Sequence, residues 1–275
     1  MEPRATAAGD GVIVSENAAG RGAVVLLCDH ASNRIPEPLG DLGLDADARR
    51  AHIAWDPGAL EVSRHLARDL DAPLVYPDLS RLVIDCNRDV AAPDLIPEIS
   101  ETTPVPGNRD LPPAERAARI ALAHAPFHET VDRLLDRRAA EGLPTVLVSI
   151  HTFTPVYKGV ARPWPIGILS NADRRLADAM IADLVAQGVP HVGDNEPYRP
   201  ADGVYYTLAR HGEARGLACA MVEIRNDEVP GDAEAILWAD RLARAIRAGL
   251  ADLVPAAAPL RHVAADGATD GARHG

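Results

Sequence analysis

Residues 23–28 read AVVLLC, and the next two residues are Asp29 and His30. A short, continuous aliphatic run of this kind is typical of a strand that is buried on both faces of a sheet. Further apolar runs that predict strands occur at residues 74–76, 82–84, 145–150, 166–169 and 219–224. Apolar residues at helical spacing predict helices over residues 56–70, 113–141 with an interruption at Pro126, 172–187 and 234–250. This alternation predicts an α/β fold, with a mostly parallel or mixed central sheet that is covered by helices on both faces.

The two ends of the chain differ in composition from the middle. Small and polar residues dominate both, so we expect a flexible N-terminus over residues 1–16 and a flexible C-terminal tail over residues 256–275. The intervening residues 17–255 show no internal repeat and no linker, which predicts a single α/β domain.

The chain is acidic, with 28 Lys and Arg residues against 40 Asp and Glu residues and a net charge of −12. A surface of this charge repels phosphate backbones and anionic lipids, so we expect neither nucleic acid nor a membrane as a partner. An anionic substrate would have to be captured by local arginines. The composition leaves the oligomeric state open.

The cysteines and the apolar segments indicate the cellular compartment in which the protein is expected. Cys28, Cys86 and Cys219 are widely spaced and predict no disulfide framework. No basic and apolar leader begins the sequence, and no apolar window reaches 18 residues. We therefore expect a cytoplasmic protein.

Two histidines stand at the ends of predicted strands, where ligands bind in sheets of this type. His30 follows the run at residues 23–28, and His151 follows the run at residues 145–150. A single histidine after a strand is more often a capping residue, but two in matching positions favour a metal site. A catalytic zinc ion needs three nitrogen or oxygen ligands and an open position for water. Candidates for a carboxylate ligand are Asp29, Asp56 and Glu223.

Polar residues also follow the run at residues 82–84. Asn87 and Arg88 could bind a substrate carboxylate, because the planar guanidinium fork matches a carboxylate. An ion pair between Asp85 and Arg88 that only shapes the turn is equally consistent with the pattern. Arg81, which precedes the run, is either an exposed residue or a second carboxylate clamp.

Glu223 lies within the apolar run at residues 219–224. A buried carboxylate is costly unless it is paired or serves a ligand, and one beside an activated water is a natural general base. The structural alternative is a pair with Arg225 or Arg210. No nucleophile elbow and no glycine-rich phosphate loop competes with this site. The remaining predicted-helix histidines, which we expect on solvated surfaces, are His52, His65, His124 and His128.

Six motifs in a fixed order resemble those of the N-formylglutamate amidohydrolase family. They are HASNRIP at 30–36, SRLVIDCNRD at 80–89, SIHTFTP at 149–155, DNEPY at 194–198, RHGEARG at 210–216 and VEIRND at 222–227. The resemblance covers roughly residues 24–250. It implies a phosphorylase/hydrolase-like fold of the zinc-peptidase type, related to metallocarboxypeptidases and to acylases that act on aspartate and glutamate derivatives.

The resemblance also implies the ligands of the metal. Its two strand-end histidines match His30 and His151. Related carboxypeptidases take the second ligand from a glutamate three residues after the first histidine, but that position here is Asn33. Asp56, in the segment AWDPGA, is the preferred substitute, and Asn33 is the alternative.

The implied reaction is the hydrolysis of N-formyl-L-glutamate, or of a related N-acyl amino acid, to formate and the amino acid, as in histidine degradation. Zinc or another divalent ion would activate a water, with Glu223 as general base and Arg88 as the second catalytic residue. The expected partner is thus a small anionic amino-acid derivative. Residues expected to bind it are Arg81, Asn87, Arg88, Arg225 and Tyr198. Two other interpretations are another zinc hydrolase of this scaffold, either a carboxypeptidase or an N-acyl amino acid deacylase, and a non-catalytic protein that binds an acidic metabolite.

Overall fold

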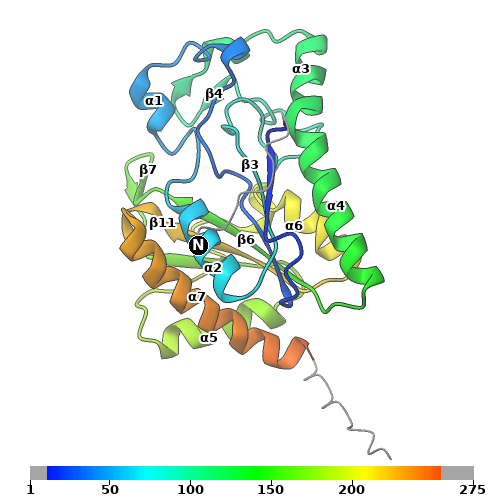
Figure 1. Cartoon of the computed structure of the whole chain (residues 1–275). Coiled ribbons are helices and arrows are strands. Elements are labelled where there is room, and N and C mark those ends of the chain that lie inside the picture. Colours follow the sequence, from blue (N-terminus) through cyan, green and yellow to red (C-terminus); the bar gives the residue numbers. More distant parts are fainter. Residues whose placement is uncertain (1–10, 255–275) are drawn as a thin grey trace, which may run out of the picture.

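The computed structural model describes residues 11–254 (Figure 1). A seven-stranded sheet forms its centre, with the strand order β1-β3-β2-β6-β11-β9-β10. The strands are β1 (Ile13–Glu16), β2 (Val24–Leu27), β3 (Leu74–Pro77), β6 (Val146–Phe153), β9 (Ile166–Leu169), β10 (Gly193–Asp194) and β11 (Cys219–Arg225). Strands β3, β2, β6 and β11 run parallel, whereas β1 pairs antiparallel with β3 and β9 pairs antiparallel with β11. The sheet is therefore mixed, and the predicted fold class is confirmed.

Helices cover both faces of the sheet (Figure 1). Helices α2 (Ala59–Asp69), α5 (Arg175–Ala186) and α7 (Asp232–Leu253) pack on one face, and α4 (Ala125–Ala140) and α6 (Tyr206–His211) on the other. Strand β2 shows why its sequence is apolar throughout. Val24 and Leu26 belong to the core under the first face, while Val25 and Leu27 belong to the core under the second. The short helix α1 (Ala46–Arg50) lies apart from both layers.

A widened turn interrupts the long helix that the sequence predicts over residues 113–141. Helix α3 (Pro113–Arg119) leads into a π-helical turn over Ile120–His124, and α4 follows. Pro126 has no backbone N–H, so the normal bond to the carbonyl four residues earlier is lost there. The N–H of Ala125 bonds instead to the carbonyl of Ile120, five residues back. The interruption at Pro126 is thus confirmed.

Two small hairpins lie outside the main sheet. One consists of β4 (Ile99–Ser100) and β5 (Thr103–Pro104), and the other of β7 (Val156–Tyr157) and β8 (Val160–Ala161). The second hairpin turns through Lys158 and Gly159, whose φ angles are 48° and 80°. Two positive φ angles in a two-residue loop are typical of a type I′ turn, whose twist matches that of the paired strands.

Two predictions from the sequence are wrong in part. Residues 82–84 form a buried turn and not a strand. Their carbonyls are bonded by distant side chains, because Asn108 donates to Leu82 and Arg119 donates to Val83. Strand β1 lies inside the range 1–16 that was expected to be flexible, since its backbone completes one edge of the sheet against β3.

The expected flexibility of residues 1–10 and of the tail 256–275 concerns segments outside the described residues. Within residues 11–254, no helix is both long enough and apolar enough to cross a bilayer.

Candidate active site

Three chemically active side chains lie in a row across the middle of the sheet. His30 follows the end of β2, His151 lies in the second half of β6, and Glu223 lies in β11. Strands β2, β6 and β11 are adjacent, and His151 and Glu223 are opposite each other in the parallel register. All three residues line a cavity of about 490 Å³. The parallel strands thus bring together residues that are separated by up to 193 positions in the sequence.

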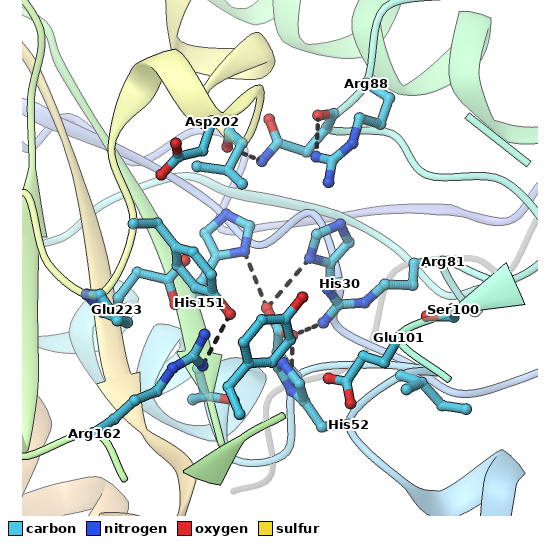
Figure 2. A pocket seen from close by; sticks show the side chains of 18 residues that line it. His30, His52, Arg81, Arg88, Ser100, Glu101, His151, Arg162, Asp202 and Glu223 are labelled. Carbon is cyan, nitrogen blue, oxygen red and sulfur yellow. Dashed lines mark hydrogen bonds and ion pairs between the residues drawn. The ribbon is translucent and has the colours of Figure 1, made fainter. Parts of the chain in front are cut away.

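The two imidazoles converge on one carboxylate (Figure 2). Nδ1 of His30 lies 3.3 Å from Oδ2 of Asp56, and Nδ1 of His151 lies 3.0 Å from the same oxygen. The ring centroids are 5.0 Å apart. One donor atom from each of these three buried residues lies within 4.8 Å of the others, which is a spacing that a metal ion can bridge. No second group of three such side chains occurs among residues 11–254.

A second carboxylate lies behind each imidazole. Nε2 of His30 lies 2.8 Å from Oδ1 of Asp85, and Nε2 of His151 lies 3.1 Å from Oδ2 of Asp29. Thr207 donates a hydrogen bond of 2.6 Å to the other oxygen of Asp29. Proteins orient metal-binding histidines in this way, since a carboxylate on one ring nitrogen leaves the lone pair of the other facing the ion. The donor set therefore fits a divalent metal.

The protonation states of His30, Asp29 and Asp85 are consistent with a metal site. Burial, reinforced by the charge of Arg81, lowers the pKa of His30 to about 4, so its imidazole is neutral near pH 7. Burial opposes ionisation of Asp29 and Asp85, but neighbouring charges outweigh it. The hydrogen bond from His151 holds the pKa of Asp29 below its usual value, and the interaction with His30 and the charge of Arg88 do the same for Asp85. A neutral imidazole backed by a carboxylate, as at His30, is the state that binds a metal.

Asp56 reaches the cavity because helix α2 begins later than the sequence indicates. Gly58 caps the helix with a φ of 85°, and Ala59 is its first residue. A side chain at Gly58 would come within 2.5 Å of Val229, so this tight turn requires glycine. The carboxylate of Asp56 is thereby free to face the histidines, and its second oxygen forms an ion pair with Arg81.

Glu223 lies in the cavity beside this cluster. The residue is buried, and its Oε2 has no hydrogen-bond partner among the described residues. Burial raises the pKa of Glu223, although the charges of His151 and Arg81 partly oppose the shift. An unpaired buried carboxylate with a raised pKa is a candidate general base.

The structure separates the predicted substrate-binding residues into two groups. Arg81, Asn87, Arg88 and Tyr198 line the cavity. Arg225 does not: its guanidinium group pairs with Asp227 and Glu228. The structure therefore corrects the expectation for Arg225, whose guanidinium group is held by these two carboxylates at the end of β11.

Asn87 and Arg88 differ in how far their side chains remain available to bind a ligand. Asn87 donates to the carbonyl of Val204 and accepts from the backbone N–H of Thr207, so its amide shapes the wall of the cavity. Arg88 donates to Asp94 at 2.7 Å and lies 3.9 Å from Asp85. The predicted ion pair between Asp85 and Arg88 thus exists alongside the position of Arg88 in the cavity.

A profile of the N-formylglutamate amidohydrolase family matches residues 22–229. The chain belongs to this family. Membership makes the protein a hydrolase that acts on an amide bond, and it sets aside the alternative of a non-catalytic binding protein.

Solved structures of other proteins resemble the chain, as two examples show. A gene product of Agrobacterium tumefaciens is 46% identical, with a TM-score of 0.85 over 88% of this chain and 96% of its own. The N-formylglutamate amidohydrolase of Ralstonia eutropha JMP134 is 17% identical and shares the fold, with a TM-score of 0.68 over 87% of this chain and 97% of its own. No curated protein matches the chain significantly.

Several residues of this family member's cavity were not expected there. Arg162 and Tyr157 lie in the connection between the predicted strands at residues 145–150 and 166–169, where no site residue was expected, and His52 was expected on a solvated surface. Nδ1 of His52 lies 3.4 Å from Oδ1 of Asp56, and burial lowers the pKa of His52 well below its usual value. His52 and Asp56 are four residues apart in the sequence, and this separation was the available signal that the two side chains could lie close together.

Three other polar residues also differ from the expectation. His124 and His128 are buried, because their Nε2 atoms bond to the carbonyls of Arg88 and Cys86. Asn33, the alternative metal ligand, donates to the carbonyl of Arg49 and does not line the cavity. Among the candidates, Asp56 is thus the carboxylate that the structure places between the histidines.

Proposed function

We propose that the protein hydrolyses N-formyl-L-glutamate to formate and L-glutamate, with zinc or another divalent ion held by His30, Asp56 and His151. The observation that supports this proposal is the convergence of two Nδ1 atoms on one oxygen of Asp56 inside the cavity, each imidazole being held from behind by a carboxylate. Family membership supports the choice of substrate. A cavity of about 490 Å³ is of a size that binds small molecules.

The metal and the protein divide the chemistry between them. When bound, a divalent ion supplies Lewis acidity, which acidifies water and polarises a carbonyl group. Glu223 accepts a proton from the attacking water and then delivers it to the nitrogen of the leaving amine, as the formyl C–N bond breaks. Its raised pKa suits both transfers, because a base that is too acidic would not take the proton.

The arginines of the cavity have two proposed roles, which are to stabilise the charge that develops during the reaction and to attract the anionic substrate. Arg81 is partly buried beside Asp56, where its guanidinium group can stabilise the negative charge that develops on the formyl oxygen. Arg88, together with the wall formed by Asn87, contributes positive charge for the anionic substrate. Tyr198 adds a hydroxyl group at the same cavity.

The test combines metal analysis with a substrate panel. Purified protein is analysed for bound metal and assayed for formate release from N-formyl-L-glutamate before chelation, after chelation and after zinc is restored. We expect turnover that chelation abolishes and zinc restores. Absence of turnover by the zinc-loaded protein would overturn the proposal. The panel also contains N-acetyl-L-glutamate and a dipeptide with a C-terminal glutamate, since faster release of amine from either would favour the deacylase or the carboxypeptidase alternative.

A further inference from the structure

The guanidinium group of Arg162 lies in an aromatic cage at the wall of the cavity. It lies 4.5 Å from the ring centroid of Tyr157, 4.8 Å from that of Tyr198 and 5.4 Å from that of Phe153. Only 8% of the residue is exposed. The rings hold a planar guanidinium group in one orientation, so its remaining N–H groups point in a fixed direction.

Arg162 differs from the other arginines of the cavity in having no acidic partner. Arg81 is paired with Asp56 and Arg88 with Asp94, whereas no carboxylate of residues 11–254 lies within 4.0 Å of Arg162. Its Nη1 donates to the hydroxyl of Tyr198 at 3.0 Å and to the carbonyl of Thr154 at 3.4 Å, and both of these acceptors are neutral. Its Nε and Nη2 donate no hydrogen bond to any described residue.

A buried charge without a counter-ion is unfavourable, because desolvation of the charge is not compensated. In this protein the imbalance lies at the wall of the cavity that the substrate enters. An anionic ligand would restore the balance, and a carboxylate matches the two free donor positions of the guanidinium fork.

The backbone places Arg162 at this point. The type I′ turn at Lys158 and Gly159 reverses the chain, and the N–H of Arg162 closes the hairpin on the carbonyl of Pro155 at 2.8 Å. In Figure 2, Arg162 and Arg88 lie on opposite sides of the pair His30 and His151. A substrate that spans the cavity would therefore have the metal-binding residues between its two ends.

We propose that Arg162 binds a free carboxylate of the substrate and is the residue that selects acidic N-acyl amino acids. This inference rests on the proposed function for the identity of the substrate, and its chemistry is carboxylate recognition by a caged guanidinium group. N-formyl-L-glutamate carries an α-carboxylate and a side-chain carboxylate, and the experiment distinguishes which of the two Arg162 binds.

The kinetic test compares Arg162→Gln with the wild type on three substrates: N-formyl-L-glutamate, N-formyl-L-glutamine and N-formyl-L-isoglutamine. We expect KM for N-formyl-L-glutamate to rise about 30-fold or more in the variant, as when a buried charge pair loses one partner, while kcat changes less than about threefold. For the substrate that lacks the carboxylate bound by Arg162, KM should be the same in the variant as in the wild type. An insensitive N-formyl-L-glutamine identifies the side-chain carboxylate, and an insensitive N-formyl-L-isoglutamine identifies the α-carboxylate. A KM within threefold of the wild type for all three substrates would overturn the proposal.

Arg244→Gln is the matched control for loss of one positive charge. Arg244 is exposed on α7, where its nearest acidic group is Asp183 at 3.6 Å, and it should leave KM unchanged. Arg162→Lys keeps the charge but loses the planar fork and should show an intermediate KM. Circular dichroism of each variant establishes that it is folded, and the lysine variant carries the test if Arg162→Gln does not fold.

A binding measurement separates this inference from the proposed function. Glutarate, a dicarboxylate that cannot be hydrolysed, is titrated calorimetrically into the wild type and into Arg162→Gln. We expect the Kd to rise at least tenfold in the variant. If N-formyl-L-glutamate is not hydrolysed but glutarate still requires Arg162, the substrate is wrong and the assignment of Arg162 stands. Equal affinities, or no binding to the wild type, would overturn the assignment even if hydrolysis is observed.

Discussion

Asp29 lies directly behind His151, with its Oδ2 3.1 Å from Nε2 of the imidazole, while Nδ1 of the same ring faces Asp56. The carboxylate thus fixes both the orientation and the tautomer of a proposed metal ligand without touching the metal position itself. Asp85 has the same relationship to His30. The site therefore has two layers, and each can be tested separately. The inner layer consists of the three proposed metal ligands, and the outer layer consists of the two carboxylates, Asp29 and Asp85, that orient the histidines.

The outer layer is tested by Asp29→Asn. The substitution keeps an acceptor for the hydroxyl of Thr207 but removes the negative charge behind His151. We expect zinc affinity to fall about 10- to 100-fold, measured by competition with a chromophoric chelator. Asp178→Asn on the exposed side of α5 is the control and should not alter the affinity. An unchanged affinity in Asp29→Asn would contradict the role of Asp29 in orienting His151.

The inner layer is tested by His151→Ala. Removal of one of three ligands should leave the purified protein with little bound zinc, measured by elemental analysis alongside the wild type. Full occupancy in the variant would remove His151 from the ligand set.

Glu223→Gln separates proton transfer from metal binding. The amide is nearly the same size as the carboxylate but cannot accept the proton from water. We expect formate release to fall about 10²- to 10⁴-fold while the zinc content stays at the wild-type level. Wild-type turnover would refute the assignment of Glu223 as the base.

Gly167 in β9 tests the support of the cavity wall. It is the register partner of Glu223, and a Cβ at this position would lie 1.7 Å from the backbone carbonyl oxygen of Glu196. Gly167→Ala must therefore displace the segment that leads to Pro197 and Tyr198, both of which line the cavity. We expect a loss of about 1–3 kcal/mol in the free energy of unfolding, together with a higher KM. Denaturant titration measures the first effect, and Gly11→Ala, which meets nothing within 4 Å, is the neutral control.

His128 should make stability depend on pH. Burial, assisted by the charges of His124, His211 and Arg210, lowers its pKa to about 3, while Asp29 opposes the shift. In the unfolded chain its pKa is near 6.5. Between these values the unfolded state binds more protons, so the stability contribution of His128 is present above pH 6.5 and is lost as the pH falls toward 3.

The variant His128→Asn isolates this effect. It should be less stable at pH 7, because bonds to His211 and to the carbonyl of Cys86 are lost. Its stability should also decline less steeply than that of the wild type between pH 6.5 and 4, in thermal unfolding followed by circular dichroism. His211 bonds to Asp132 and continues to titrate in both proteins, so the comparison of slopes carries the test. Identical slopes would contradict the prediction, because they would show that the pKa of His128 is the same in the folded and the unfolded state.

The sequence predicted correctly those strands whose burial makes every residue of a short run apolar. Runs such as residues 23–28 and 219–224 are apolar because both sides of each strand are covered, and this requirement leaves a pattern within the run itself. The positions of His30 and His151 followed from the rule that ligands bind near the carboxyl ends of parallel strands.

The sequence was less informative where distant residues decide the structure. Residues 82–84 are as apolar as a strand, but Asn108 and Arg119 take over the hydrogen bonds that a neighbouring strand would have made. Arg162 reaches the cavity through a hairpin turn, and its isolation from acidic groups is visible only in three dimensions. No pattern of apolar spacing encodes either arrangement.

The hairpin formed by β7 and β8 contributes no proposed metal ligand, yet it carries Tyr157 and ends immediately before Arg162. His151 and Glu223, two of the residues proposed to break the amide bond, lie in strands of the central sheet, whereas Arg162, the residue proposed to recognise the substrate, directly follows a short hairpin outside that sheet. Selectivity could therefore diverge among homologues by exchange of the hairpin together with Arg162, while the residues proposed for hydrolysis stay the same. In protein engineering, replacement of residues 156–162 as one unit would be a route to redirect the enzyme toward a different acyl amino acid.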